Sequence, residues 1–110
     1  MKILAAIITH NRCELLERCI NHLQKQTRLP DSILVVNNGS TDATVDMLMR
    51  RNIQHITQEN LGSAGGWNRC ISYALEHHFD AVWLMDDDGF PSPSALECLE
   101  SNLDTDTACV

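Results

Sequence analysis

Apolar runs of strand length recur along this chain, and each run ends at a group of polar residues. Unbroken apolar runs are typical of strands buried on both faces, whereas a strand with one exposed face alternates apolar and polar residues. The third predicted strand is short and has polar neighbours, so we expect it near an edge of the sheet. The predicted strands are Lys2–Thr9, Ser32–Val36, Ile53–Thr57 and Ala81–Met85.

Segments with a helical spacing of apolar residues separate these runs. The first predicted helix covers Cys13–Gln26, and a turn cluster at Asn37–Asp42 caps the second. A glycine-rich loop, Asn60–Gly66, leads into the third helix. The residues predicted to face inward are Val45, Leu48 and Met49 in the second helix and Trp67, Ile71, Ala74 and Leu75 in the third.

A fourth helix is predicted after Pro91-Ser92-Pro93. Proline suits the first turn of a helix, and Ser94 with Glu97 has the spacing of a capping box. The expected inner stripe of this helix is Leu96, Leu99 and Leu103. The last residues, Ala108–Val110, have the character of the start of another strand.

Strands and helices alternate with short connections, which predicts an α/β fold with an open, mostly parallel sheet and helices on both faces. A chain of 110 residues is long enough for one hydrophobic core and too short for two, so we expect one domain over residues 1–110. Ligands of such sheets bind outside the carboxyl ends of the strands. The polar groups expected there are Thr9–Arg12, Asn37–Asp42, Asn60–Gly66 and Asp86–Asp88.

Composition narrows the class of partner. The formal net charge is −7 and no basic run is present, which argues against a nucleic-acid partner. We recognise no signal peptide and no transmembrane stretch. The five cysteines form no C-x-x-C pair, and Cys19, Cys70 and Cys98 fall on apolar faces of predicted helices, so we expect no disulfide framework. The expectation is a reduced, cytoplasmic protein, with the inner face of the membrane as the alternative place of action.

Three consecutive aspartates, Asp86, Asp87 and Asp88, follow the fourth strand, and no Lys or Arg lies within ten residues of them. Two carboxylates about 5 Å apart repel by roughly 3 kcal/mol at an effective dielectric of about 20. A divalent cation offsets this repulsion, and carboxylate oxygens are ligands that Mg²⁺ and Mn²⁺ prefer. In an extended backbone, Asp86 and Asp88 point to one side and Asp87 to the other, so Asp86 and Asp88 are the predicted metal ligands. The alternative is that the aspartates cap a turn or the next helix.

The neighbouring loops carry groups that suit a nucleotide. Neutral donors and acceptors that could contact a base or a ribose, or that could instead only form a turn, are Thr9, Asn37, Asn38 and Ser40. Gly62, Gly65 and Gly66 would let backbone N–H groups approach an anion at the start of a helix. Arg12 and Arg69 are nearby cations that could meet a diphosphate or stay solvated. With a metal ion, these groups predict a site for a nucleoside diphosphate linked to a further group.

Four motifs, in this order along the chain, resemble glycosyltransferase family 2, whose members have the GT-A fold. They are Ile7–Arg12 (IITHNR), Val35–Asp42 (VVNNGSTD), Asn60–Gly66 (NLGSAGG) and Trp83–Asp88 (WLMDDD). The resemblance covers essentially the whole chain, and the last two motifs look most like those of the rhamnosyl- and galactofuranosyltransferase branch. It implies that residues 1–110 form the amino-terminal, donor-binding part of a GT-A domain without its acceptor half.

The resemblance also implies roles for single residues. Asp86 and Asp88 would hold Mn²⁺ or Mg²⁺ against the diphosphate of a UDP- or dTDP-sugar. The implied nucleotide-binding residues are Thr9, Asn11, Arg12, Asn37, Asn38, Asp42, Gly65, Gly66, Asn68 and Asp87. Two positions depart from the family pattern, because Asn37 stands where the family often has Asp and His10 replaces the usual Tyr. Both departures change the contacts that a base could make.

For the reaction, the resemblance implies inverting transfer of a sugar to a glycan or lipid-linked acceptor, in the synthesis of cell-surface polysaccharides. The catalytic base of the family is expected beyond residue 110, and a homo-oligomer is left open. One alternative is a nucleotide-sugar-binding module without catalysis. Another is a receiver-like phosphoacceptor domain, although this would need acidic residues where the chain has Thr9-His10-Asn11. A dinucleotide oxidoreductase is excluded, because its glycine motif directly follows the first strand.

Overall fold

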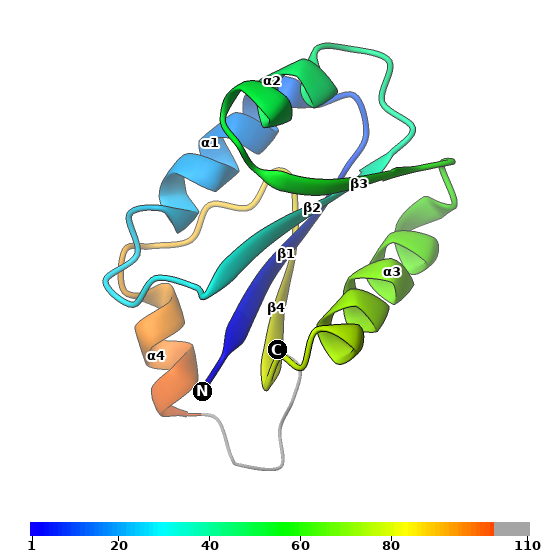
Figure 1. The fold of residues 1–110 in the computed structure, drawn as a ribbon. Helices are drawn as coiled ribbons and strands as arrows, with labels where there is room; N and C mark the ends of the chain where they lie inside the picture. The colour runs from blue at the N-terminus through cyan, green and yellow to red at the C-terminus, as the bar shows by residue number, and fades with distance from the viewer. Residues whose placement is uncertain (103–110) are drawn as a thin grey trace.

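The computed structural model describes residues 1–102, and these form parallel strands and helices in strict alternation (Figure 1). The strands are β1 (Ile3–Thr9), β2 (Ser32–Asn38), β3 (Gln54–Gln58) and β4 (Ala81–Asp86). The helices are α1 (Cys13–Leu23), α2 (Thr44–Arg50), α3 (Gly62–Glu76) and α4 (Ala95–Ser101). Two further predictions, for Leu103 and for Ala108–Val110, lie outside the described residues.

The sheet has the strand order β3-β2-β1-β4, and all of its pairs are parallel. All seven residues of the central strand β1 are buried. Alternate residues of β1 face opposite sides: Ile3, Ala5 and Ile7 pack with α1, α2 and α4. Leu4, Ala6 and Ile8 pack with α3 on the other side (Figure 1). The predicted open parallel sheet with helices on both faces is therefore confirmed, and so is the edge position of the third strand.

The strand register brings the polar strand ends together. Thr9 of β1 lies opposite Asn37 of β2, and Ile8 lies opposite Asp86 of β4. β2 is longer than the predicted Ser32–Val36, because its two asparagines continue the pairing with β3. Asn residues with buried side chains can therefore extend a strand when a neighbouring strand forms hydrogen bonds with their backbone N–H and C=O groups.

The predicted glycine-rich loop is wrong, because these glycines lie in the first turns of α3, which begins at Gly62. The inner face of the helix also differs from the prediction. Cys70, Tyr73 and Ala74 are buried, and Trp67 is partly buried. Ile71 and Leu75, predicted to face inward, are 38% and 72% exposed.

The other helices differ from prediction mostly at their ends. α1 stops at Leu23 rather than Gln26, and the inner face of α2 contains Met47, whereas Met49 is exposed. In α4, Leu96 is buried, but the predicted capping box is wrong, because Ser94 makes no side-chain cap bond. Glu97 instead accepts a hydrogen bond from Thr27 Oγ1 at 2.7 Å. A tertiary partner has here displaced a local one.

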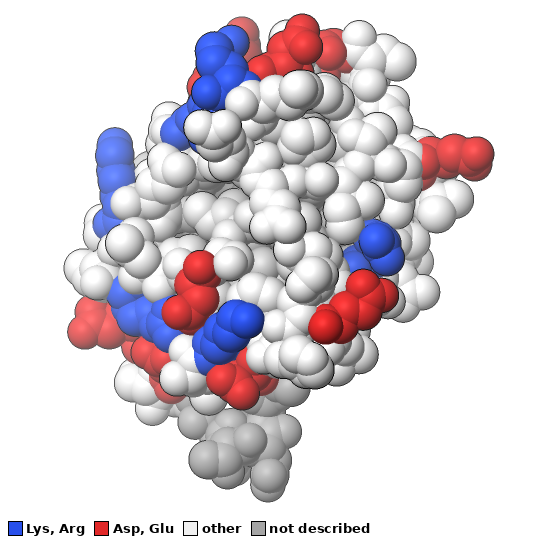
Figure 2. Space-filling view, in the orientation of Figure 1, with Lys and Arg blue, Asp and Glu red and all other residues white. Residues whose placement is uncertain are grey.

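The cysteines and the charged surface residues match only in part what we expected from the composition. The four described cysteines are free thiols, and Cys19 and Cys70 are buried as expected, but Cys98 is exposed. None of the described helices is both long and apolar enough to cross a membrane. On the face in Figure 2, the described basic side chains lie apart from one another, most of them beside acidic ones, and form no continuous patch.

Stability should fall in acid partly because of Asp31. Burial raises the pKa of Asp31, but hydrogen bonds from the backbone N–H of Ile3 and from Arg28 outweigh it, so the pKa lies below its ordinary value. A carboxyl whose folded pKa is depressed stabilises the protein above its unfolded pKa, and this stabilisation is lost as the pH falls through the folded pKa. We expect urea unfolding of Asp31→Asn to depend less on pH below about pH 4 than that of the wild type. Identical pH slopes would contradict this role.

Candidate functional site

A cleft of about 230 Å³ lies at the carboxyl ends of β1, β2 and β4. Its lining residues are Ile8, Thr9, His10, Arg12, Asn38, Asn60, Gly62, Asp86 and Asp87. Five of them are predicted site residues, namely Thr9, Arg12, Asn38, Asp86 and Asp87. The nucleotide-binding residues implied by the resemblance do not include His10, Asn60 or Gly62, although each belongs to one of the four sequence motifs and Gly62 is expected to approach an anion through its backbone. A motif taken as a whole was therefore the signal that could have found them.

A second depression, of about 510 Å³, lies next to the first. It is lined by Asn11, Arg12, Cys13, Glu14, Leu15, Asp42 and Ala43. Arg12 lines both spaces, and its side chain is 55% exposed. The predicted residues Asn11 and Asp42 therefore lie beside the cleft rather than in its lining, with Arg12 between.

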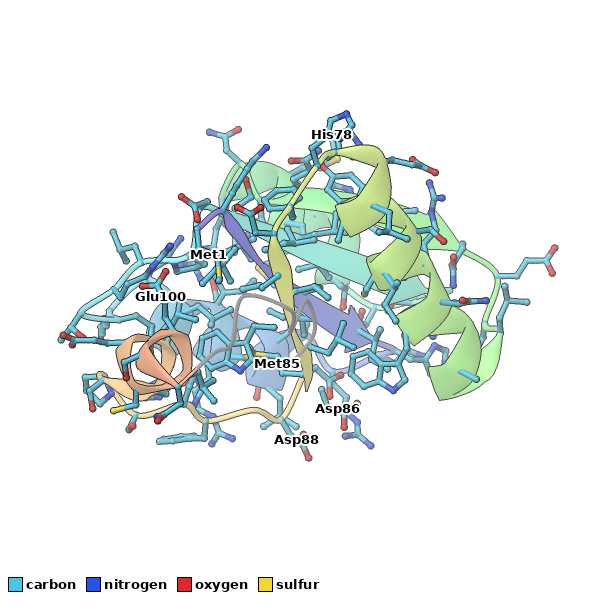
Figure 3. All side chains as sticks on the ribbon, turned by 90° about the horizontal axis from the view of Figure 1, so that it is seen from below. Met1, His78, Met85, Asp86, Asp88 and Glu100 are labelled. Carbon is cyan, nitrogen blue, oxygen red and sulfur yellow. The ribbon has the colours of Figure 1, made fainter. Side chains whose placement is uncertain are left out.

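The three aspartates follow a sharp change in backbone direction. β4 ends at Asp86, and the backbone N–H of Gly89 donates to the carbonyl oxygen of Asp86 at 3.0 Å. We call residues 86–89 the acidic turn. The extended backbone assumed for the metal pair therefore does not continue to Asp88. The carboxylates still separate, because Asp87 is 4% exposed whereas Asp86 and Asp88 are exposed at the carboxyl end of β4 (Figure 3).

Asp87 connects the acidic turn to β1. Its Oδ2 accepts a hydrogen bond from Thr9 Oγ1 at 2.9 Å, and its Oδ1 lies 3.5 Å from Arg12 Nη1. Burial raises the pKa of Asp87 above its ordinary value, because the bond from Thr9 and the charge of Arg12 offset the desolvation only in part. Both carboxylate oxygens are thus already engaged with protein groups. Asp87 therefore stabilises the wall of the cleft, whereas the exposed Asp86 is available to a ligand.

Asn11 joins two loops. Its φ is +52°, a backbone conformation that asparagine tolerates better than most residues. Its Oδ1 accepts hydrogen bonds from the backbone N–H groups of Thr41, at 2.7 Å, and Asp42, at 3.3 Å. Its own N–H donates to Ser40 Oγ at 3.0 Å. These bonds tie the loop after β1 to the loop after β2, which fixes the rim of the cleft.

The two asparagines at the end of β2 are similarly engaged. Asn37 Oδ1 accepts a bond from the backbone N–H of Ser40, so its buried amide forms the turn. Asn38 Oδ1 accepts from Gln58 Nε2 at 2.8 Å, and Asn38 Nδ2 donates to the carbonyl oxygen of Gly62 at 3.2 Å. The turn-forming alternative is realised for Asn37. Asn38 also lines the cleft.

Asp42 supports the starts of two helices. Its carboxylate accepts hydrogen bonds from the backbone N–H groups of Cys13, at the start of α1, and Thr44, at the start of α2, and also from the Thr44 hydroxyl. Burial raises the pKa of Asp42, but these bonds outweigh it and hold the pKa below its ordinary value. An ionised carboxylate at two helix N-termini also complements the helix dipoles.

Gly65 and Gly66 serve packing inside α3. A Cβ on Gly66 would lie 2.7 Å from Ile8 Cγ2 and 3.2 Å from Asn38 Nδ2. A Cβ on Gly65 would lie 2.4 Å from Leu61 Cβ. The absence of a side chain at Gly66 thus lets α3 approach β1 and β2 closely, whereas Gly65 makes room for Leu61 at the start of the same helix. Gly65, Gly66 and Asn68 do not line the cleft, but Gly62 at the start of the helix does.

His10 completes a hydrogen-bond chain along the rim. Its Nδ1 lies 2.7 Å from the carbonyl oxygen of Asn38, and its Nε2 lies 3.4 Å from Asn11 Nδ2. A carbonyl only accepts, so Nδ1 must carry a proton. Because Asn11 Oδ1 is engaged by backbone N–H groups, Asn11 Nδ2 is the atom that faces the ring, and it needs an acceptor at Nε2. The chain of bonds thus selects the neutral Nδ1–H tautomer.

This tautomer can be tested directly. We expect long-range ¹H–¹⁵N spectra at neutral pH to show His10 protonated at Nδ1 and bare at Nε2, because the nitrogen that faces a carbonyl must be the donor. His55 is an internal reference, since its Nδ1 lies 3.0 Å from the carbonyl oxygen of Ile53. A proton on Nε2 of His10 in place of Nδ1 would contradict the hydrogen-bond chain.

A metal ion would need more than protein ligands here. In residues 1–102, no group of three or more His, Cys, Asp or Glu side chains could hold a metal ion. Magnesium, however, commonly binds through one or two carboxylates, water and the phosphates of a substrate. Asp86 and Asp88 are exposed, and within the described chain neither takes part in an ion pair. The donor set therefore fits a cation shared with a diphosphate, and does not fit a resident structural ion.

Comparison with known proteins settles the family. A sequence model described as Glycosyl transferase family 2 matches residues 5–110. The chain belongs to glycosyl transferase family 2. Galactofuranosyltransferase GlfT1 of Mycobacterium tuberculosis is 39% identical over 92 residues, which are 79% of this chain and 30% of that protein. GlfT1 of Mycolicibacterium smegmatis is 32% identical over 95 residues, or 84% of this chain and 32% of that protein.

Solved structures at 22% identity share the fold of this chain. S. aureus TarS superposes with a TM-score of 0.72 at 22% identity, over 92% of this chain and 19% of TarS. A shorter form, TarS 1–349, in complex with UDP has a TM-score of 0.67 over 92% of this chain and 31% of that one. The family 2 chain described here spans about a third of the length of the GlfT1 proteins it matches.

Proposed function

We propose that this chain binds the nucleotide-diphosphate sugar donor, UDP- or dTDP-linked, of a metal-dependent glycosyltransferase. The observation that carries the proposal is Asp86, an exposed carboxylate that lines the same cleft as Asn38 and Arg12 in a member of glycosyl transferase family 2. Carboxylate, amide and guanidinium are the groups needed for a cation, a nucleoside and a diphosphate, respectively. The UDP complex of the structurally similar TarS supports a uridine nucleotide.

In this proposal, Asp86 and Asp88 hold Mn²⁺ or Mg²⁺, which when bound would neutralise charge on the departing diphosphate. Arg12 has a half-exposed side chain at the border between the two depressions, so its guanidinium can turn from Asp87 toward the phosphates. Thr9 and Asp87 keep the cleft wall in place through their hydrogen bond. The hydrogen-bonded rim of His10, Asn11 and Asn38 then faces the nucleoside.

The acceptor reaction is the wider part of the proposal. We propose inverting transfer to a glycan or lipid-linked acceptor, as in the synthesis of cell-surface polysaccharides, with the catalytic base supplied by residues outside this sequence. The name of the GlfT1 relatives makes galactofuranose the first sugar to assay on the donor.

Calorimetric titration of the 110-residue chain with UDP, with and without Mn²⁺, tests donor binding. We expect Mn²⁺ to increase UDP affinity about 100-fold, which corresponds to about 2.7 kcal/mol. ADP is the matched nucleotide, because it has the same diphosphate and a different base. Binding of UDP that EDTA leaves unchanged would contradict metal dependence, and the absence of any heat would contradict the donor site.

A further inference from the structure

The segment that begins with the acidic turn is attached to α1. The ring of Phe90, directly after the turn, has its centroid 4.1 Å from that of His22 and 4.6 Å from Arg18 Cζ. Arg18 and His22 are four residues apart and therefore lie one above the other on α1. Phe90 is nevertheless 61% exposed. Its ring is held in place by two α1 side chains although it buries little surface.

Further contacts continue this attachment on both sides of Phe90. Cys19 Sγ lies 3.6 Å from Met85 Sδ, just before the acidic turn. A Cβ on Gly89 would lie 3.4 Å from Cys19 Sγ and 3.0 Å from the carbonyl oxygen of Asp86. The acidic turn therefore packs directly on α1. Beyond Phe90, Gln26 Nε2 donates to the carbonyl oxygen of Ser92 at 2.6 Å. Residues of α1 and of the turn that follows it thus contact the chain before and after the aspartates.

The aspartates need such support, because neighbouring carboxylates repel one another and favour an open turn. The described bond within the turn, from the Gly89 N–H to Asp86, is a single backbone hydrogen bond. We propose that Phe90, packed against Arg18 and His22, is a positioning residue that fixes the acidic turn for a cation and a diphosphate. The ligand part of this inference rests on the proposed function.

Phe79 offers a matched control elsewhere in the chain. Lys2 Nζ lies 4.4 Å from its ring centroid, and the ring of Tyr73 stacks at 6.5 Å. Phe79 is therefore also held by a cation and a second ring, but it packs against the core beneath α3. Truncation of Phe79 should lower Tm more than truncation of Phe90, without affecting the acidic turn.

The experiment compares Phe90→Ala, Phe79→Ala and Phe90→Tyr in the 110-residue chain. Amide hydrogen exchange of Gly89 reports opening of the turn without any ligand, and UDP titration with and without Mn²⁺ reports its use. For Phe90→Ala we expect Gly89 to exchange about fivefold faster and Mn²⁺ to increase UDP affinity about fivefold less than in the wild type. The reason is that the variant loses an exposed cation–π contact and a ring pair. Phe90→Tyr keeps the ring and should restore both values.

The outcomes separate the two proposals. Unchanged Gly89 exchange and an unchanged gain from Mn²⁺ in Phe90→Ala would overturn the positioning role. An equal increase of Gly89 exchange in Phe79→Ala would also overturn it, because the effect would then be a general loss of stability. If the wild-type chain shows no Mn²⁺-dependent UDP binding, the proposed function fails. The comparison of Gly89 exchange still decides whether Phe90 fixes the acidic turn.

Discussion

Replacement of both exposed aspartates, Asp86→Asn and Asp88→Asn, should remove the metal-dependent part of UDP affinity. Asparagine keeps the size of each side chain but lacks the charge that a divalent cation needs from its ligands. We expect a loss of about 100-fold in the presence of Mn²⁺, about 2.7 kcal/mol, and little change in its absence. Calorimetric titration with UDP at constant ionic strength measures both values.

The matched control removes two acidic charges elsewhere. Asp46 and Glu76 are exposed and do not line either depression. The variant Asp46→Asn/Glu76→Gln therefore has the same net charge as the test variant, and it should keep the response to Mn²⁺. An equal loss in both variants would show that overall charge, rather than the acidic turn, governs UDP binding.

Gln26→Leu should destabilise the fold more than any other single polar substitution proposed here. The side chain is 4% exposed, and its Nε2 donates to the carbonyl oxygens of His22 and Ser92. Its Oε1 accepts from the backbone N–H of Leu96 at 3.0 Å. Leucine would leave the buried N–H of Leu96 unpaired, at a cost of about 1–3 kcal/mol. It would also remove one hydrogen bond from each of the two carbonyl oxygens, which still accept from the N–H groups of Lys25 and Ala95. We expect a total loss of about 3 kcal/mol in the free energy of urea unfolding.

Gln24→Leu is the control for this substitution. Gln24 lies two residues earlier, its side chain is exposed, and its Oε1 accepts a bond from Arg51 at 2.9 Å. A surface bond of this kind contributes little, so the change in unfolding free energy should stay within about 0.5 kcal/mol. Equal effects of the two substitutions would mean that Gln26 does not connect α1 to the segment before α4.

The hydrophobic pattern predicted the sheet well, because the apolar residues of a buried strand are consecutive in the sequence. A strand covered on both faces must be apolar at every position, and β1 meets this requirement with all seven residues buried. The same reasoning failed for α3, where the glycines at positions 62, 65 and 66 suggested a loop. Glycine disfavours a helix interior on average, but close packing of Gly66 on Ile8 outweighs that preference.

The candidate site could be predicted as a set of loops, but not as a set of contacts. The sequence motifs name every residue that lines the cleft, since they follow strands that the register brings side by side. The sequence did not reveal that Asn11 and Asp42 face other loops, or that Asp87 binds Thr9. An Asn or Asp side chain has the same hydrogen-bonding groups whether it faces a ligand or a neighbouring loop.

By itself, then, the sequence determined the order of strands and helices along the chain, the two-sided burial of β1 and the gathering of polar loops at one sheet edge. Each follows from residues close together in the chain and from the parallel direction of the strands. Only the tertiary structure decided which aspartates stay exposed and which loops Asn11 joins. It also decided that α1 contacts Phe90 after the acidic turn, and that Gln26, just beyond α1, binds the segment before α4. Thr9 and Asp87, whose bond helps to keep Asp87 buried, are 78 positions apart, and local preference carries no information about such partners.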